Sequence, residues 1–80
     1  MNHIGKQQHH HYQHKKLMRI REVMQMTGIS KSHIYHLSST GKFPKSISLV
    51  PGGTSRAWVS TEVDTWLEER IAERDQEAYA

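Results

Sequence analysis

The sequence predicts a small, mainly α-helical domain with one β-hairpin, arranged as a winged helix-turn-helix of three helices plus a wing. Three observations predict this fold. Two short helical patterns meet at Thr27-Gly28, two strand-like segments flank the Gly-rich turn Pro51–Ser55, and a last amphipathic helix follows Ser60. The length of 80 residues allows a single small domain.

The first helix is indicated by apolar residues three apart. Ile20, Val23 and Met26 have this spacing, and the pattern stops at Gly28. Glycine adopts positive φ easily and often follows the end of a helix. The sequence therefore predicts a first helix of about two turns.

The second helix is specified at both ends and is expected from Lys31 to about Thr40. Ser30 can cap it, because its hydroxyl can accept a hydrogen bond from an unpaired amide of the first turn. Gly41 suits the left-handed position after a helix, and Pro44 cannot continue one. Ile34 and Leu37 fall on one face, which is expected to be buried.

The opposite face of this helix is rich in hydrogen-bonding groups and carries no acid, since Asp and Glu are absent from Gln25 through Ser60. An ordinary solvated face would explain a lone helix of this kind. The short connection to the preceding helix instead favours a surface that faces DNA. The candidate recognition-helix residues are Ser30, Lys31, Ser32, Tyr35, His36 and Ser39, with Thr40 at the flank.

The wing is predicted from a strand, a turn and a second strand. Lys45–Val50 alternates in polarity, with Ile47 and Leu49 expected on the buried side, and Arg56–Val59 follows the turn. Small residues at the tip would let backbone amides approach phosphate, and an arginine could enter the minor groove. A plain connecting turn is the alternative. The candidate wing residues are Gly52, Gly53, Thr54, Ser55 and Arg56.

The last helix carries an apolar stripe at helical spacing, and Ser60 or Thr61 is expected to cap it. A dimerisation surface is the alternative interpretation of this stripe, but so small a domain needs these side chains for its core. The expected core residues are Ile20, Val23, Met26, Ile29, Ile34, Leu37, Phe43, Ile47, Leu49, Trp58, Val63, Trp66, Leu67 and Ile71.

The two ends of the chain are polar. Residues 1–16 form a His-rich leader that we expect to be a disordered arm, residues 17–74 the DNA-binding domain, and residues 75–80 a frayed tail. Imidazoles are common metal ligands, but a flexible basic arm is favoured over a metal site. The leader's histidine cluster comprises His9, His10, His11 and His14.

Composition narrows the class of protein. The chain has no cysteine, which excludes disulfides and cysteine-based zinc sites. It shows no long apolar run or signal-like leader, so we expect a cytoplasmic protein without a membrane segment. No acid, base and nucleophile converge in sequence, and no phosphate-binding motif is present. We expect neither enzymatic activity nor a cofactor.

Charge is divided unevenly along the chain. Residues 1–60 hold nine basic residues against Glu22 alone, a formal charge of +8, whereas residues 61–80 hold two basic and seven acidic residues, a charge of −5. A polyanion would be attracted to the first part and repelled by the last helix. The candidate phosphate contacts are Lys15, Lys16, Arg19, Arg21, Lys42 and Lys45.

Several motifs together resemble the AlpA family of prophage regulatory proteins. They are EVMQMTGIS, SHIY, GKFPKSISL and RAWVSTEVDTWLEERI, and the resemblance spans about Leu17 to Ala72. It implies the winged helix of MerR-like and excisionase-like proteins, with Ser30, Lys31, Ser32, Tyr35 and His36 on the recognition helix and Thr54 to Arg56 on the wing. His36 and Ser38-Ser39-Thr40 depart from a more basic family pattern, so a target sequence does not carry over.

The resemblance implies a DNA-binding regulator of mobile-element genes that activates an excision or integrase gene. An excisionase that bends attachment-site DNA is the first alternative, and a protein-interaction adaptor or antitoxin-like protein is the second. The expected partners are double-stranded DNA and either RNA polymerase or an integrase. A monomer is expected in solution, with several copies side by side on DNA because one such module buries little surface.

Overall fold

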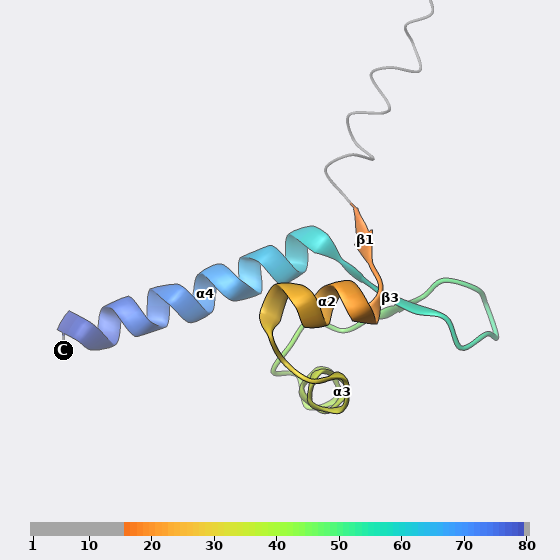
Figure 1. The fold of residues 1–80 in the computed structure, drawn as a ribbon, viewed down its shortest axis with the longest axis horizontal. Coiled ribbons are helices and arrows are strands. Elements are labelled where there is room, and N and C mark those ends of the chain that lie inside the picture. The colour runs from red at the N-terminus through yellow and green to blue at the C-terminus, as the bar shows by residue number, and fades with distance from the viewer. Residues whose placement is uncertain (1–15, 80) are drawn as a thin grey trace, which may run out of the picture.

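The computed structural model describes residues 16–79 and confirms the predicted class, a mainly α-helical domain with a small antiparallel sheet. Two short helices precede the wing, and one long helix follows it (Figure 1). The elements in chain order are β1 (Leu17–Met18), α2 (Ile20–Thr27), α3 (Lys31–Ser39), β2 (Ile47–Ser48), β3 (Arg56–Val59) and α4 (Ser60–Tyr79).

The helix-turn-helix has the ends that the sequence predicts. Gly28 follows α2 with φ of 75°, and its N–H donates to the carbonyl of Met24 over 2.8 Å. Ser30 caps α3, with its Oγ accepting from the backbone N–H of His33 at 3.3 Å. Gly41 takes a φ of 79° just after α3. These local signals fix the break of three residues, 28–30, between the helices and therefore the direction in which α3 leaves α2.

Removing the Ser30 cap tests how much this local chemistry contributes. We expect Ser30→Ala to lower the free energy of unfolding by about 1 kcal/mol, because one amide of the first turn loses its partner. Urea unfolding followed by circular dichroism measures the change. Ser32→Ala is the matched control, since Ser32 is exposed on the first turn of α3. Equal losses in both variants would show that the cap has no specific role.

The sheet contains a strand that the sequence analysis missed. The strand order is β1-β3-β2, with Met18 opposite Trp58 and Ile47 opposite Ala57, and both pairs are antiparallel. The backbone N–H of Ser60 also donates to the carbonyl of Lys16 over 2.7 Å. The residues before α2 are therefore tied to the end of the wing and to the start of α4.

The core is centred on Trp58, which is completely buried and lies between the sheet and the helices. It packs in one cluster with Met18, Val23, Ile34, Phe43 and Val63. The partly buried residues that pack against this cluster are Ile20, Met24, Ile29, Leu37, Trp66 and Leu67. Ten of the predicted core residues are thus in or against the core, together with Met18, Met24 and Ala57, which were not predicted.

Four predicted core positions are wrong. Met26, Ile47, Leu49 and Ile71 are exposed, because no other element within residues 16–79 covers the outer side of α2, the wing or the second half of α4. The first wing strand is also shorter than predicted, with only Ile47–Ser48 paired out of the expected Lys45–Val50. The wing is consequently an exposed hairpin and not a half-buried one.

Helix α4 is longer than the core requires. It begins at Ser60 itself, so the predicted capping position lies inside the helix, and the carbonyl of Lys16 takes the N–H of Ser60 instead. The helix continues to Tyr79. Fraying of residues 75–80 remains a prediction. Residues 1–15 of the predicted His-rich leader, 1–16, lie outside the described residues, and so does its histidine cluster.

Candidate nucleic-acid interface

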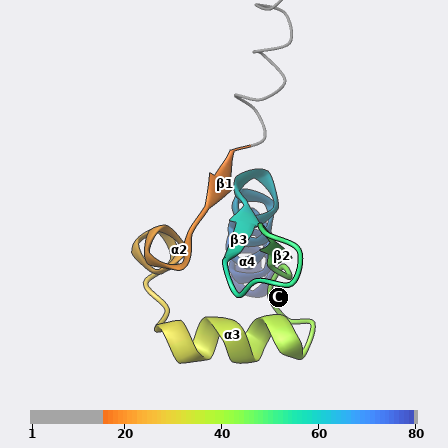
Figure 2. The same cartoon turned by 90° about the vertical axis from the view of Figure 1, so that its right-hand side faces the viewer.

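Most of the outer face of α3 is exposed, and among residues 16–79 only the ring of Tyr35 on this face lies against the core. Figure 2 shows α3 lying crosswise at the lower edge of the domain, with α2 and the sheet on one side only. Ile34 and Ser38 are buried toward the domain. The outward residues are exposed as predicted: Lys31, Ser32, Tyr35, His36, Ser39 and Thr40. The helix therefore presents a donor-rich face without an acid.

Two of these residues have other contacts as well. The ring of Tyr35 lies 5.5 Å from that of Trp58, centroid to centroid, at an interplanar angle of 56°. The hydroxyl of Ser39 donates to the carbonyl of His36 over 2.8 Å. Tyr35 is therefore held at one orientation by the core, and Ser39 offers an acceptor more readily than a donor. Ser32 and His36 keep their polar groups available.

The structure brings α3 and the base of the wing together around one concave surface. A cavity of about 340 Å³ is lined by Tyr35, Ser38, Ser39, Lys45, Ser46 and Arg56. In the sequence, these residues belong to three separate groups of candidates or to none. Their convergence brings hydroxyl-bearing residues and the cations Lys45 and Arg56 around one surface between the recognition helix and the wing, which we call the α3–wing concavity.

Arg56 is held in this concavity by Ser46. Its Nε donates to Ser46 Oγ over 2.9 Å, and an Nη atom donates to the carbonyl of Ser46 over 3.0 Å. The guanidinium is exposed and retains further N–H groups for an anion. Arg56 therefore lies at the base of the wing, where it can bind a phosphate beside α3, and away from the tip.

Two more cations border the same region. Arg19 donates from its Nε to the carbonyl of Arg56 over 3.0 Å, and Lys45 donates from its Nζ to the carbonyl of Ser38 over 3.3 Å. Both side chains are exposed. Arg19, Lys45 and Arg56 therefore form a cationic cluster around the base of the wing.

The other candidate phosphate contacts are separated from this cluster. The carbonyl of Lys16 accepts from Ser60, and the carbonyl of Lys42 accepts from Trp66 Nε1 over 2.8 Å, so both residues lie beside the first half of α4. Arg21 is exposed on α2. Lys15 lies outside the described residues. The structure thus divides the predicted phosphate contacts into two groups.

The tip of the wing is exposed and tightly turned. Gly52, Gly53 and Thr54 are exposed, Ser55 is half-buried, and Gly52 adopts a φ of 79°. The N–H of Gly53 donates to the carbonyl of Val50 over 2.8 Å. The predicted turn is therefore present, and its residues are accessible to a partner.

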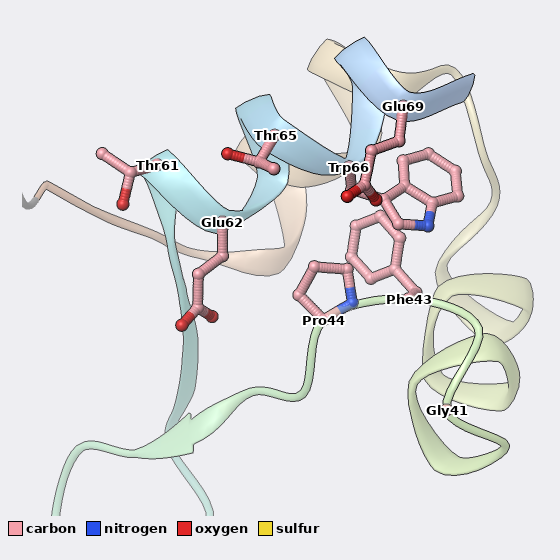
Figure 3. Close-up of a pocket in the computed structure, with 8 residues that line it drawn as sticks. All are labelled: Gly41, Phe43, Pro44, Thr61, Glu62, Thr65, Trp66 and Glu69. Carbon is pink, nitrogen blue, oxygen red and sulfur yellow. The ribbon is translucent and has the colours of Figure 1, made fainter. Parts of the chain in front are cut away.

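A second concavity lies on α4 and has a different character. It has a volume of about 430 Å³, and Figure 3 shows Phe43 and Pro44 lying beside Trp66 along it. The rings of Phe43 and Trp66 meet edge to face, 4.7 Å apart. Glu62 and Glu69 also line it. This groove on α4 therefore combines apolar rings with acidic side chains, whereas the α3–wing concavity is lined by cations.

Charge is distributed along the long axis of the molecule. Among residues 16–60, seven basic residues face one acid, a charge of +6, and among residues 61–79 two basic residues face seven acids, a charge of −5. Figure 1 shows the wing and the far end of α4 pointing in opposite directions. A polyanion that approaches α3 and the wing is therefore met by the cationic part of the molecule.

Within residues 16–79, no group of three or more His, Asp or Glu side chains is arranged to hold a metal ion. No helix in that part of the chain is long and apolar enough to cross a membrane.

Two residues of the candidate interface were not predicted from the sequence. Ser46 anchors Arg56, and Ser38 connects α3 to the core by donating to the carbonyl of Pro44 over 3.0 Å. Serine in a polar stretch gives no periodic signal. Only the helical spacing from Ile34 to Ser38 could have placed Ser38 on the buried face.

Comparison with known families agrees with this geometry. The model of the family described as prophage CP4-57 regulatory protein (AlpA) matches residues 16–71, which contain both concavities and the wing. The chain belongs to the AlpA family. This confirms the resemblance inferred from the motifs.

The AlpA chain is also similar to a phage protein. It is 43% identical over 60 residues to an uncharacterized protein, ORF88, of Enterobacteria phage P4. The match covers 75% of this chain and 66% of that protein, so the AlpA chain spans just under two thirds of its relative's length. No solved structure matches the AlpA chain.

Proposed function

We propose that this AlpA-family protein is a sequence-specific DNA-binding transcriptional regulator of a prophage or other mobile element. The observation that carries the proposal is the continuous surface of α3 and the wing, in which Tyr35 and Ser39 adjoin Lys45 and Arg56 around one concavity. Exposed donors beside fixed cations are the groups that contact base edges and phosphates.

In this proposal α3 enters a major groove and the wing follows the adjacent minor groove. Ser32, His36 and Ser39 face base edges. Lys31 and Tyr35 lie toward phosphates, and the cationic cluster of Arg19, Lys45 and Arg56 holds the backbone between the grooves. One module of this size buries only about 600–1,000 Å² on DNA, so we expect several copies on adjacent repeats.

The regulatory role that we favour is activation of an excision or integrase gene in the bacterial cytoplasm. The acidic α4 faces away from the wing, and its groove around Trp66 offers a surface for RNA polymerase. The same groove would serve an excisionase that contacts an integrase. An in vitro excision assay with the cognate integrase separates the two roles, because an activator alone leaves recombination unstimulated.

The apolar groove on α4 also supports a second candidate, an adaptor that binds only protein. We favour DNA binding because binding only protein would not account for the cationic cluster or for the acid-free face of α3. We propose no catalytic activity and no cofactor for this protein.

Salt dependence of binding tests the proposed function. We expect the protein to protect a site in the DNA that flanks its own gene. The logarithm of its association constant should fall against the logarithm of salt concentration with a slope of about −3.6, because four phosphates held by Arg19, Lys31, Lys45 and Arg56 contribute about 0.9 each. Footprinting and fluorescence titration at several salt concentrations measure both. Absence of protection together with a slope near zero would contradict the proposal.

A further inference from the structure

The wing carries aliphatic side chains that are exposed and do not pack in the core. Ile47, Leu49 and Val50 are 42%, 37% and 54% exposed. Residues 46–55 also contain no charged side chain. The hairpin therefore projects an uncharged, partly apolar tip from a base that is cationic.

The tip is held in one shape by hydrogen bonds. The N–H of Leu49 donates to the carbonyl of Ser55 over 2.9 Å, and Ser48 Oγ donates to the carbonyl of Val50, also over 2.9 Å. A Cβ atom on Gly53 would lie only 3.2 Å from the Cβ of Val50. Glycine at this position therefore allows the chain to fold tightly behind Val50, whose side chain remains exposed.

The dimensions of the hairpin suit a minor groove, with one conflict. From the last paired residues, Ser48 and Arg56, the hairpin extends four residues to Gly52, which gives a reach of up to about 13 Å. The minor groove is about 7.5 Å deep, so the tip can reach its floor while Arg56 stays level with the phosphates. The groove is only about 6 Å wide, however, which is narrower than two strands with side chains.

We propose that the tip formed by Leu49, Val50 and Pro51 acts as an apolar wedge that opens the minor groove and bends the DNA. This inference rests on the proposed function. Apolar wedges of this kind separate base steps and kink the duplex by about 20–90°. The cationic cluster of Arg19, Lys45 and Arg56 supplies the attraction to flanking phosphates, and the uncharged tip supplies the deformation.

The experiment separates contact with DNA from deformation of DNA. A duplex that holds one footprinted site carries a fluorophore at each end, and energy transfer between them reports the bend. Val50→Lys adds a cation to the tip but removes the apolar group. We expect its affinity to equal or exceed that of the wild type and its bend to fall below half. Ile47→Lys is the matched control, because it places the same new charge on the same hairpin and removes an exposed aliphatic side chain from the paired base instead of the tip, so it should keep the full bend.

A double variant, Leu49→Ser with Val50→Ser, guards against a special effect of lysine and should also lose more than half of the bend. Thermal unfolding of every variant verifies that a reduced bend does not result from unfolding of the protein. An unchanged bend in Val50→Lys and in the serine variant would overturn the wedge. The wedge would also be overturned if these variants kept the bend but lost cooperative binding to two adjacent sites. In that case the tip would contact a neighbouring copy of the protein.

The outcomes for the wild type distinguish the two proposals. A wild-type protein that binds its site with a steep salt dependence but leaves the duplex straight overturns the wedge alone. A wild-type protein that binds no DNA overturns the proposed function, and the wedge with it.

Discussion

Replacing Lys45 and Arg56 together by glutamine is expected to weaken DNA binding about 60-fold at 0.1 M salt. Each phosphate contact contributes about 0.9 to the slope of log affinity against log salt, so two lost contacts lower the affinity by about 1.8 log units at that concentration. The slope itself should become shallower by about 1.8. Fluorescence titrations over a range of salt concentrations measure both quantities on one duplex.

The matched control is the double variant Lys16→Gln with Lys42→Gln. It removes the same total charge, but from residues that lie beside α4 and not around the α3–wing concavity. We expect its slope to change by less than half as much. Equal effects of the two double variants would mean that net charge, and not the cationic cluster, attracts DNA.

The stability of these variants is a necessary companion measurement. Arg56 donates two hydrogen bonds to Ser46, and removing an exposed pair of this kind costs about 1 kcal/mol. From the sequence alone, Arg56 would be expected to contribute almost nothing to stability. A loss of several kcal/mol with intact DNA binding would reassign Arg56 from the interface to the fold.

Replacing Trp58 by alanine is expected to unfold most of the protein at 25 °C. Trp58 is fully buried, and its Nε1 donates to the carbonyl of Pro44 over 3.0 Å. Truncating such a side chain costs about 3–5 kcal/mol, which matches the whole stability that a core of this size supplies. Circular dichroism at 222 nm during urea unfolding measures the loss.

Two further variants show whether the ring or the hydrogen bond of Trp58 contributes more to the stability of the fold. Trp58→Phe keeps most of the ring but removes the donor, so we expect a folded protein with a loss of about 1 kcal/mol from one hydrogen bond, because the carbonyl of Pro44 still accepts from Ser38 Oγ. Trp66→Ala makes the same truncation at a half-buried ring and should cost less than Trp58→Ala. A Trp58→Ala variant as stable as the wild type would contradict the central place of this ring in the core.

Features that depend on neighbours in sequence could be predicted. The cap at Ser30, the glycines after α2 and α3, and the span of β3 all follow from local rules, and the structure has them where the sequence indicates. The class of fold follows from the order of these elements. The outward face of α3 could be predicted for the same reason, because helical spacing alone decides which residues share a face.

Features that depend on distant partners could not be predicted. Strand β1 has two residues, and Met18 pairs with Trp58, forty positions away. Ile47, Leu49 and Ile71 have the spacing of core residues, but spacing does not reveal whether another element covers them. The cationic cluster is a third case, since the contact of Arg19 with Arg56 and the anchoring of Arg56 by Ser46 connect separate segments.

The anchoring of α3 by Ile34 and Ser38 has a consequence for how this protein can acquire new targets. Ser32 and His36 make no side-chain hydrogen bonds within residues 16–79, so their replacement removes nothing from the core. Recognition and folding are carried by different residues of the same nine-residue helix. A library randomised at outward positions of α3 should therefore yield mostly folded members with altered sequence preference, which makes this small domain a scaffold for retargeting.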